Sequence, residues 1–516
     1  MFKNRVLLVG LVAMVLASLM LGAMAEHQPG IESHYHYRMA GEIASGDLRP
    51  SPGEHLPLGP LASDYPVDHH WGLHLLMVPL TWLGDIYEDD YLGLKLGSVF
   101  FFMFTILGFY WVLQRFRIPY ASVLCLCPLA FEALGWRYLQ LRGGGLMAVG
   151  LLYWAYCTFW LHKAFRSTLI AYFLMISYQG AFLMLPLCVA GVGARLMVEK
   201  RPFQENVQPL KWTLLGIIAG LFAGPYLWQS FSFLLFHLNT AFGDPGAYYS
   251  TGHEFSPLTW SMLQGAPEYL VLAVLLFGTA MVSFKHRKEL DPRVMSFVAM
   301  SLTLLLLSVR SMRILEYAVP FGILTIALVA FCRSYRVKPY LQVVSVILVA
   351  IFIAKRLDQT ITMGQGRTPT GAYDGMASML QAEEGIIGNL YQADFSLILW
   401  AAPEAKCVQG LNHYFVHEDI RIALDRLKMK GQRYYRPIED KENIISSLKT
   451  LVKSGVTLFT ARPSRGDWSH PMVQFAQSNP DVLTPVFPES LKLQRWSQAA
   501  DSFVWAWRPG PLLSLQ

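Results

Sequence analysis

Apolar residues in this sequence come in runs of about 20, separated by short polar segments, rather than in stripes along amphipathic helices. A bilayer offers no hydrogen-bond partner to a free peptide N–H or C=O, so runs of this length are predicted to be transmembrane helices. The fifth and sixth runs share one long apolar stretch that is interrupted only over residues 177–180. The pattern predicts about eleven spans, over residues 6–25, 91–113, 119–136, 144–161, 168–182, 183–198, 212–233, 268–284, 294–309, 314–332 and 340–355.

Composition agrees with a polytopic α-helical membrane protein. Of the 516 residues, 53% are hydrophobic and only 15% are charged, which is far from the balance of a soluble domain. The net charge of +6 is accounted for by short basic loops, so it indicates no nucleic-acid partner. The chain is therefore expected to have membrane lipids as its surroundings.

The basic loops also predict an orientation, because short loops rich in Lys and Arg stay in the cytoplasm. Lys3 and Arg5 place the N-terminus inside, and every second loop after that is basic. An odd number of spans then sends residues 358–516 outside, together with a first external loop over about 26–90. In a bacterium this would be a multi-pass protein of the inner (plasma) membrane with a periplasmic C-terminal domain. The first span also resembles a cleavable signal peptide ending at Ala23-Met24-Ala25, and cleavage would leave the later topology unchanged.

The parts outside the membrane have their own patterns. Both ends of the first loop read as helices, over residues 33–45 and 70–83, too short to cross and predicted to lie along the membrane surface. The C-terminal part alternates helical patterns with short apolar runs, which favours a small α/β domain. The helical patterns cover residues 373–381, 417–430 and 441–454, and the apolar runs 386–391, 456–461, 482–486 and 503–507. We therefore divide the chain into a transmembrane domain, residues 1–357, and a C-terminal domain, residues 358–516.

Several kinds of chemistry have no signal in the sequence. It contains no Gly-rich phosphate loop, Gly-x-Ser-x-Gly elbow or nucleotide fingerprint, so no nucleotide cofactor is expected. Cys407 is the only cysteine of the C-terminal domain, so an internal disulfide framework is excluded there. No cysteine spacing typical of a metal site occurs.

The first candidate constellation is Glu32-Ser33-His34-Tyr35-His36-Tyr37-Arg38, directly after the first span. A carboxylate held at a membrane surface among aromatic residues can accept a proton from a hydroxyl or bind a divalent ion. Glu32 is equally explained as a solvated charge that favours the N-terminus of a helix.

The second constellation, Asp68-His69-His70-Trp71-Gly72-Leu73-His74, ends the same loop. His70 and His74 are four residues apart on one helical face, so with Asp68 they could bind zinc. Asp68 could also act as a general base, or simply cap the following helix.

The third constellation is a set of arginines in outward turns, where the charge rule predicts few basic residues. These are Arg137 and Arg142 between the third and fourth spans, and Arg310 and Arg313 between the ninth and tenth. The positions of Arg310, Arg313 and Tyr317 predict one helical face, with Glu316 near enough to orient a guanidinium. Such arginines can clamp a lipid phosphate with bidentate hydrogen bonds. The alternative is that they extend to ordinary phospholipid headgroups.

Together these motifs resemble the GT-C superfamily of membrane glycosyltransferases. Glu32 ahead of Tyr35-His36-Tyr37-Arg38 is similar to the Asp-Pro-Tyr-Phe-Asn-Tyr-Arg pattern of oligosaccharyltransferase catalytic subunits. The Arg-x-x-Arg-x-x-Glu-Tyr-x-x-Pro segment from Arg310 to Pro320 is part of the resemblance to the superfamily. The Asp68-His69-His70 motif and the C-terminal segments 389–395 and 409–412 resemble uncharacterised bacterial relatives. The Trp-Trp-Asp motif, with which oligosaccharyltransferases recognise their acceptor sequon, is absent, and this makes peptide N-glycosylation an unfavoured activity.

The resemblance implies transfer of a sugar from a polyprenyl phosphate or diphosphate carrier to a glycan, lipid or protein acceptor outside the cytoplasm, generally with inversion. It implies Asp68 or Glu32 as the base, and Arg310, Arg313, Arg137 and Arg142 at the lipid phosphate. His69, His70, His36, Glu316 and Tyr317 would support these groups. A divalent metal ion, which some relatives need, would have Glu32, Asp68, His70 and His74 as candidate ligands.

Two other classes of protein would share this hydropathy. A transporter or flippase for lipid-linked saccharides is also polytopic, but it is expected to show broken helices at mid-membrane and internal symmetry, which the sequence does not display. A non-catalytic component of an envelope polysaccharide assembly machine would use the C-terminal domain for docking and would not require Asp68.

Overall fold

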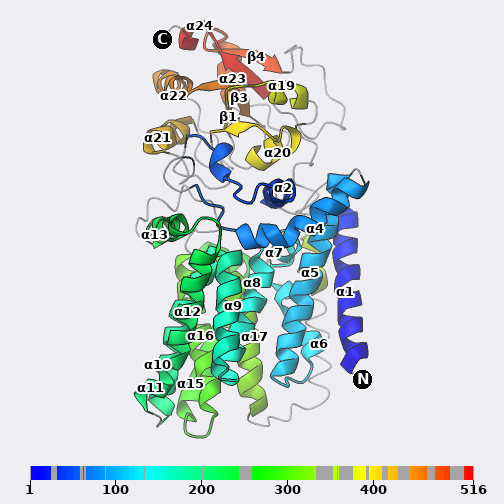
Figure 1. Cartoon of the computed structure of the whole chain (residues 1–516), viewed down its shortest axis with the longest axis vertical. Helices are drawn as coiled ribbons and strands as arrows, with labels where there is room; N and C mark the ends of the chain where they lie inside the picture. Colours follow the sequence, from blue (N-terminus) through cyan, green and yellow to red (C-terminus); the bar gives the residue numbers. More distant parts are fainter. Residues whose placement is uncertain are drawn as a thin grey trace. The chain divides into compact units, whose positions relative to one another are not determined.

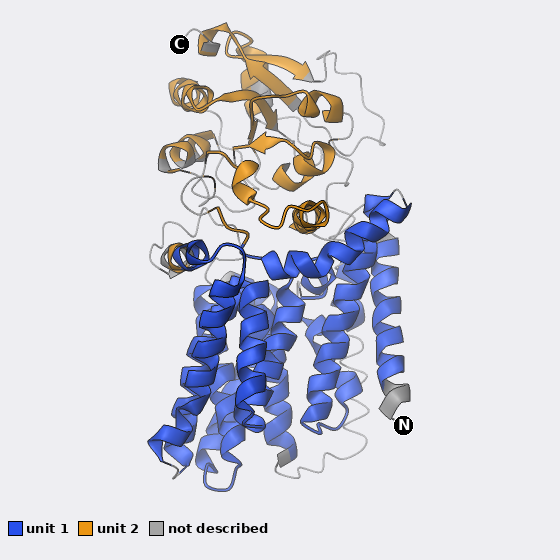
Figure 2. Ribbon diagram, in the orientation of Figure 1, with its two compact units in different colours: residues 1–25, 69–234, 253–366 blue, residues 26–68, 235–252, 367–516 orange. Residues whose placement is uncertain are grey.

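The chain divides into two compact units in the computed structural model. The structure describes residues 2–24, 32–58, 62, 66–87, 89–131, 134–199, 202–242, 258–332, 353–356, 358–359, 373, 376–390, 394–408, 417–427, 441–461, 471–487 and 505–514. Unit 1 comprises residues 1–25, 69–234 and 253–366, and unit 2 comprises residues 26–68, 235–252 and 367–516 (Figure 2). Residues 26–68 of the first loop thus belong to the same unit as the C-terminal part of the chain.

Unit 1 is a bundle of apolar helices (Figure 1). Large apolar side chains such as Leu7, Phe104 and Val274 are exposed on its sides, as expected of surfaces that face lipid. The helical elements in chain order are α1 (Phe2–Met24), α4 (Trp71–Tyr87), α5 (Asp90–Arg115), α6 (Ala121–Leu124), η2 (Cys127–Ala130), α7 (Leu134–Leu139), α8 (Gly144–Ala155), η3 (Tyr156–Trp160), α9 (Ala164–Ser177), η4 (Gln179–Leu183), α10 (Met184–Val198), α11 (Phe203–Asn206), α12 (Gln208–Ala223), the start of α13 (Trp228–Phe242), α14 (Trp260–Gly265), α15 (Pro267–Lys285), α16 (Pro292–Arg310), η7 (Met312–Ile314) and α17 (Leu315–Cys332).

The number of membrane spans is only partly confirmed. Among the described residues, five helices are long and apolar enough to cross a bilayer: α5, η4 with α10, α15, α16, and η7 with α17. A sixth is added if the bent pair formed by α12 and α13 counts as one span. The apolar part of α1 and helix α9 are shorter. The predicted span over residues 340–355 lies largely outside the described residues, so the count of about eleven remains a prediction.

Two predicted spans are wrong as single helices. Residues 119–136 form the short elements α6, η2 and α7, because Tyr120 is left-handed (φ 60°) and Pro128 lacks the N–H that a continuous helix needs. Residues 212–233 are broken after Ala223, at Gly224 and Pro225, and α13 turns 112° away from α12. Hydropathy alone registers neither break, since every residue involved is apolar or small.

Glycine allows close packing between two of the bundle helices. A Cβ on Gly216 of α12 would lie 2.4 Å from the backbone oxygen of Thr168 on α9, and one on Gly220 would lie 2.7 Å from that of Tyr172. Small residues four apart are a common way for membrane helices to approach. The hydroxyl of Thr168 donates a 3.1 Å hydrogen bond to the backbone oxygen of Trp212 across this contact.

Ion pairs fasten the end of the bundle where α10 ends and α16 begins. Arg195, with only 2% of its side chain exposed, donates to Glu199 at 2.8 Å. Arg293 pairs with Asp291, the residue that caps α16. Burial opposes the charged form of Asp291, but the hydrogen bonds from Arg293 outweigh it and hold the pKa of this carboxyl below its ordinary value.

Unit 2 contains a five-stranded mixed sheet with helices, in agreement with the alternation of patterns in the sequence. Its elements are α2 (Glu32–Ala44), η1 (Pro52–Glu54), α19 (Ala377–Gln381), β1 (Ile386–Asn389), α20 (Asp394–Ala401), β2 (Lys406–Cys407), α21 (Glu418–Leu427), α22 (Lys441–Lys453), β3 (Val456–Ala461), α23 (Pro471–Ser478), β4 (Leu483–Phe487), β5 (Trp505–Pro509) and α24 (Pro511–Ser514). The strand order is β2-β1-β3-β5-β4, with β1 parallel to both neighbours and β5 antiparallel to both of its own. Buried residues of α21, α22 and α23 pack in one core with Val456, Phe459 and Trp507.

Candidate functional site

Most of the predicted site residues of unit 1 gather at one end of its bundle. Helices α4 and α13 lie across this end, which also holds α7 (Figure 1). The start of α4 packs directly on the end of α9: a Cβ on Gly72 would lie 2.8 Å from the backbone oxygen of Ile176. The backbone N–H of Gln179 donates to the backbone oxygen of His69 at 3.3 Å. These contacts tie the Asp-His-His motif to the break between α9 and α10.

Glu316 joins the two arginine-bearing turns. Its Oε1 accepts hydrogen bonds from Arg137 and from Arg142, which precede α8, while Glu316 itself lies in the first turn of α17. The side chains of Glu316 and Arg142 are each only 2% exposed, and that of Arg137 is 14% exposed. A carboxylate shared by two guanidiniums in a buried setting fixes both of them in place.

The start of α8 is shaped around the same carboxylate. A Cβ on Gly144 would come within 2.3 Å of Oε2 of Glu316, so only glycine leaves that oxygen its position. Gly144 is the first residue of α8, and a helix N-terminus favours a negative charge. The hydroxyl of Tyr138 lies 3.5 Å from the backbone oxygen of Glu316.

Arg313 belongs to a second group, centred on Tyr178. The guanidinium carbon of Arg313 lies 5.8 Å from the centroid of the Tyr178 ring, and the same ring stacks on His70 with centroids 4.8 Å apart. Tyr178, Arg313 and Arg142 all approach Tyr317 closely enough to interact with it electrostatically. Tyr178 and Tyr317 thus connect the arginines to the histidines.

The histidines form a compact cluster next to Asp68. The rings of His69 and His70 have centroids 4.0 Å apart, and those of His70 and His74 are 5.9 Å apart. Asp68 is 2% exposed. Candidate ligand atoms of the consecutive residues Asp68, His69 and His70 all lie within 4.8 Å of one another. A carboxylate with imidazoles at this spacing suits a divalent ion such as zinc.

One geometric prediction about the arginines is wrong. Arg310, Arg313 and Tyr317 do not share a face of one helix, because α16 ends at Arg310, Ser311 is extended (φ −148°, ψ 117°), and α17 begins only at Leu315. The ion pairs found for Glu316 come from the other arginine-bearing turn rather than from its own segment. Arg310 is partly exposed at the end of α16.

The predicted residues from the first part of the loop, Glu32, His36 and Asp68, lie in unit 2. Glu32 is the first residue of α2 and partly exposed. His36 is buried on the same helix, with its ring against Tyr35 at a centroid distance of 5.3 Å. The predicted approach of Glu32 to Asp68 remains a prediction. Of the C-terminal segments used for the resemblance, residues 391–393 and 409–412 lie outside the described residues.

Sequence reasoning missed Tyr178, Gln179 and Gly144. The signal for the first two was present as the polar interruption over residues 177–180, which we interpreted only as a boundary between spans. Polar residues that break a long apolar run deserve a functional interpretation, since placing them among apolar helices is costly.

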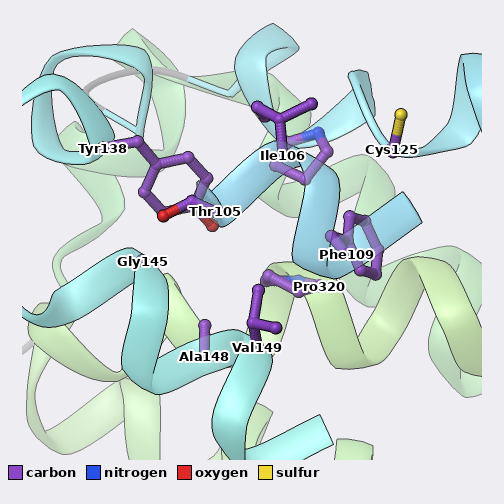
Figure 3. A pocket seen from close by; sticks show the side chains of 10 residues that line it. Thr105, Ile106, Phe109, Cys125, Tyr138, Gly145, Ala148, Val149 and Pro320 are labelled. Carbon is purple, nitrogen blue, oxygen red and sulfur yellow. The ribbon is translucent and has the colours of Figure 1, made fainter. Parts of the chain in front are cut away.

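A small, mostly apolar pocket lies next to this region (Figure 3). Ile106 and Phe109 of α5, Val149 of α8 and Pro320 of α17 line it, and Tyr138 and Thr105 stand at one side. Its walls carry few polar groups, so it offers little to a sugar or a phosphate. The polar groups described above remain the candidate site.

Comparisons with known proteins agree on the fold. No model of a protein family matches the sequence, and no curated protein matches it either. Among solved structures, the chain is similar to the archaeal oligosaccharyltransferase AglB from Archaeoglobus fulgidus in complex with an inhibitory peptide and a dolichol-phosphate, with a TM-score of 0.57 and 12% identity over 99% of this chain and 77% of that chain. The apo form of the Archaeoglobus fulgidus enzyme gives a TM-score of 0.56 and 13% identity over 98% and 77%. Its complex with Zn and sulfate gives 0.51 and 11% over 92% and 71%.

The chain therefore shares its fold with these oligosaccharyltransferase structures, and the resemblance inferred from its motifs is confirmed at the level of the fold.

Proposed function

We propose that this chain transfers a sugar from a polyprenyl-phosphate-type carrier to an acceptor on the non-cytoplasmic side of the membrane. The observation that carries the proposal is the contact of Tyr178 with Arg313, a phosphate-binding type of residue, and with His70, which follows the candidate base Asp68 by two positions. The fold similarity to an oligosaccharyltransferase supports the same class of reaction.

The charges in the site suit the carrier phosphate. Three arginines, Arg137, Arg142 and Arg313, and one carboxylate, Glu316, leave a net charge of about +2. A sugar-bearing phosphodiester has one negative charge, and the phosphate that leaves has up to two. The site thus favours the state in which negative charge develops on the leaving oxygen, which is how preorganised charges accelerate a reaction.

The two groups of arginines have different roles in this proposal. Because Arg137 and Arg142 are both hydrogen bonded to Glu316, they provide positive charge at a fixed position. Arg313, held against the Tyr178 ring, is the arginine we assign to direct contact with the phosphate, with Arg310 beside it in sequence. A guanidinium suits this contact because it donates two parallel hydrogen bonds.

Asp68 or Glu32 serves as the base. The acceptor oxygen attacks the anomeric carbon, the bond from that carbon to the phosphate oxygen breaks, and the acceptor proton passes to the carboxylate. The phosphate leaves on its lipid carrier, and attack from the opposite side inverts the anomeric centre. The acceptor, whether glycan, lipid or protein, is not specified by these residues.

The donor set at Asp68 and His70 fits a divalent metal ion, with His74 and Glu32 as further candidate ligands. Such an ion would supply additional positive charge to the donor phosphate. A solved structure of similar fold is described as a complex with Zn and sulfate.

The proposal is tested by replacing Arg313 in the full-length protein. Arg313→Ala should lower transfer of labelled sugar from undecaprenyl-phosphate-linked donors in membranes by about 30- to 1,000-fold, since it removes a charged donor worth about 2–4 kcal/mol in the transition state. Arg313→Lys should recover only part of the loss, because lysine keeps the charge but not the fork. Arg287→Ala, at the opposite end of the bundle, is the matched control. Equal transfer by Arg313→Ala and wild type at equal protein level would refute this assignment.

A further inference from the structure

Gln179 lies at the junction of the elements that build the candidate site. It is the first residue of η4, follows Tyr178, and is 6% exposed. Its backbone N–H is bound to the backbone oxygen of His69. The ring of His69 in turn contacts Phe233 of α13, with centroids 5.2 Å apart. The Gln179 side chain is therefore enclosed between α4, α9 and α13.

The orientation of the Gln179 amide is fixed by its partner. The side-chain nitrogen Nε2 donates to the backbone oxygen of Ser230 at 3.4 Å. A backbone carbonyl can only accept, so the amide cannot be turned over without placing two oxygens against each other. Oε1 is thus the atom on the other side, and it has no hydrogen-bond partner among the described residues. A buried acceptor that is left without a hydrogen bond destabilises the structure that holds it.

The chemistry of Oε1 specifies what can meet it. It is an acceptor, so its partner has to bring an O–H or N–H group, and the acceptor oxygens of an ionised phosphate would be repelled. The phosphate is instead assigned to Arg313, whose guanidinium lies next to the Tyr178 ring. The part of a sugar-phosphate donor that carries hydrogen-bond donors is the sugar, through its hydroxyl groups.

We propose that Gln179 is a sugar-binding residue, whose Oε1 accepts a hydrogen bond from a hydroxyl of the sugar that is transferred. This inference rests on the proposed function and adds a division of roles to it. Arg313 binds the phosphate that all donors share, while Gln179 binds the part that distinguishes one donor from another. A buried acceptor rejects an analogue that lacks the matching hydroxyl, so Gln179 contributes to sugar specificity.

The test measures binding to the full-length protein in nanodiscs, in the absence of any acceptor. The probes are undecaprenyl phosphate without a sugar and a panel of undecaprenyl-phosphate-linked hexoses and pentoses. Wild type should bind at least one sugar-bearing member more tightly than sugar-free undecaprenyl phosphate. Gln179→Leu should lower the affinity for that sugar-bearing member by about tenfold, the effect of one neutral hydrogen bond. The affinity for the sugar-free probe should not change.

Three further variants separate the explanations. Gln179→Asn keeps an amide, with both a donor and an acceptor atom, and should retain part of the preference for the sugar-bearing probe. Gln208→Leu, at the other end of the bundle, should change neither affinity. Arg313→Ala should lower the affinity for both probes. If it does not, the proposed function is refuted, whatever the result for Gln179.

Two results would overturn the inference about Gln179 alone. An equal loss for both probes in Gln179→Leu would show a structural role, and unchanged binding of both would show that Oε1 meets only water. Thermal unfolding of each variant identifies those that fail to fold. If Gln179→Leu does not fold, the inference is decided by Gln179→Asn, and an affinity for the sugar-bearing probe no higher than for the sugar-free one would refute it.

Discussion

Asp68→Asn should lower the rate of sugar transfer by about 10²- to 10⁴-fold, the range that a positioned general base contributes. The amide has nearly the same shape as the carboxylate but cannot take the proton of the acceptor hydroxyl. Because the substitution leaves Arg313 in place, kcat should fall while the affinity for undecaprenyl phosphate changes little. Transfer assays with labelled undecaprenyl-linked sugars, alongside binding of sugar-free undecaprenyl phosphate, measure the two quantities.

Two companion variants make the result decisive. Asp85→Asn, at an exposed position of α4, the helix that follows Asp68 in the sequence, is the matched control and should transfer at the wild-type rate. Glu32→Gln distinguishes the two candidate bases. A fall in the transfer rate of about 10²- to 10⁴-fold is expected only when the carboxylate that takes the proton is replaced. Full activity in Asp68→Asn would remove Asp68 from the mechanism, and full activity in both Asp68→Asn and Glu32→Gln would remove the base altogether.

Glu316→Leu should destabilise unit 1 by about 3–5 kcal/mol, the usual effect of leaving a buried charge without its partner. Two guanidiniums, those of Arg137 and Arg142, would lose the carboxylate that they share. The measurement is the thermal unfolding temperature of the purified protein in detergent. Glu289→Leu is the control, because the Glu289 side chain is 71% exposed and pairs with His286 at the surface, and it should change the stability by less than about 1 kcal/mol.

A double replacement tests the physical reason. Glu316→Leu combined with Arg142→Leu removes one of the stranded charges as well, so the double variant should be more stable than Glu316→Leu alone. If the stability changes of the two single variants simply add, Arg142 and Glu316 are not coupled, and Glu316 does not hold Arg137 and Arg142 in place as proposed.

The parts of the fold that sequence predicted best are those set by local patterns. The alternation in the C-terminal part located β1, β3, β4 and three of its helices to within a few residues, because period and length distinguish short strands from amphipathic helices. The break at Tyr178 was also visible as polar residues in an apolar run. By contrast, Pro128 and the Gly224-Pro225 pair break spans whose mean hydropathy is high, and a hydropathy window averages over such breaks.

The site was predictable as a set of residues but not as a set of partners. Arg137 and Glu316 are 179 positions apart, so no spacing rule could pair them. Spacing also led to the wrong helical face for Arg310, Arg313 and Tyr317, because it assumes an unbroken helix where Ser311 is extended. The contact of Tyr178 with both Arg313 and His70 depends on the packing of α4 on α9, which only the tertiary structure reveals.

The most direct test of the central claim is the position of the carrier phosphate in the full-length protein. Cryo-electron microscopy of the protein in nanodiscs with undecaprenyl phosphate should place that phosphate at hydrogen-bond distance, about 2.7–2.9 Å, from the guanidinium of Arg313 and next to the Asp68-His69-His70 cluster. A phosphate bound away from Arg313, or at the end of the bundle that holds Arg195 and Arg293, would contradict the account.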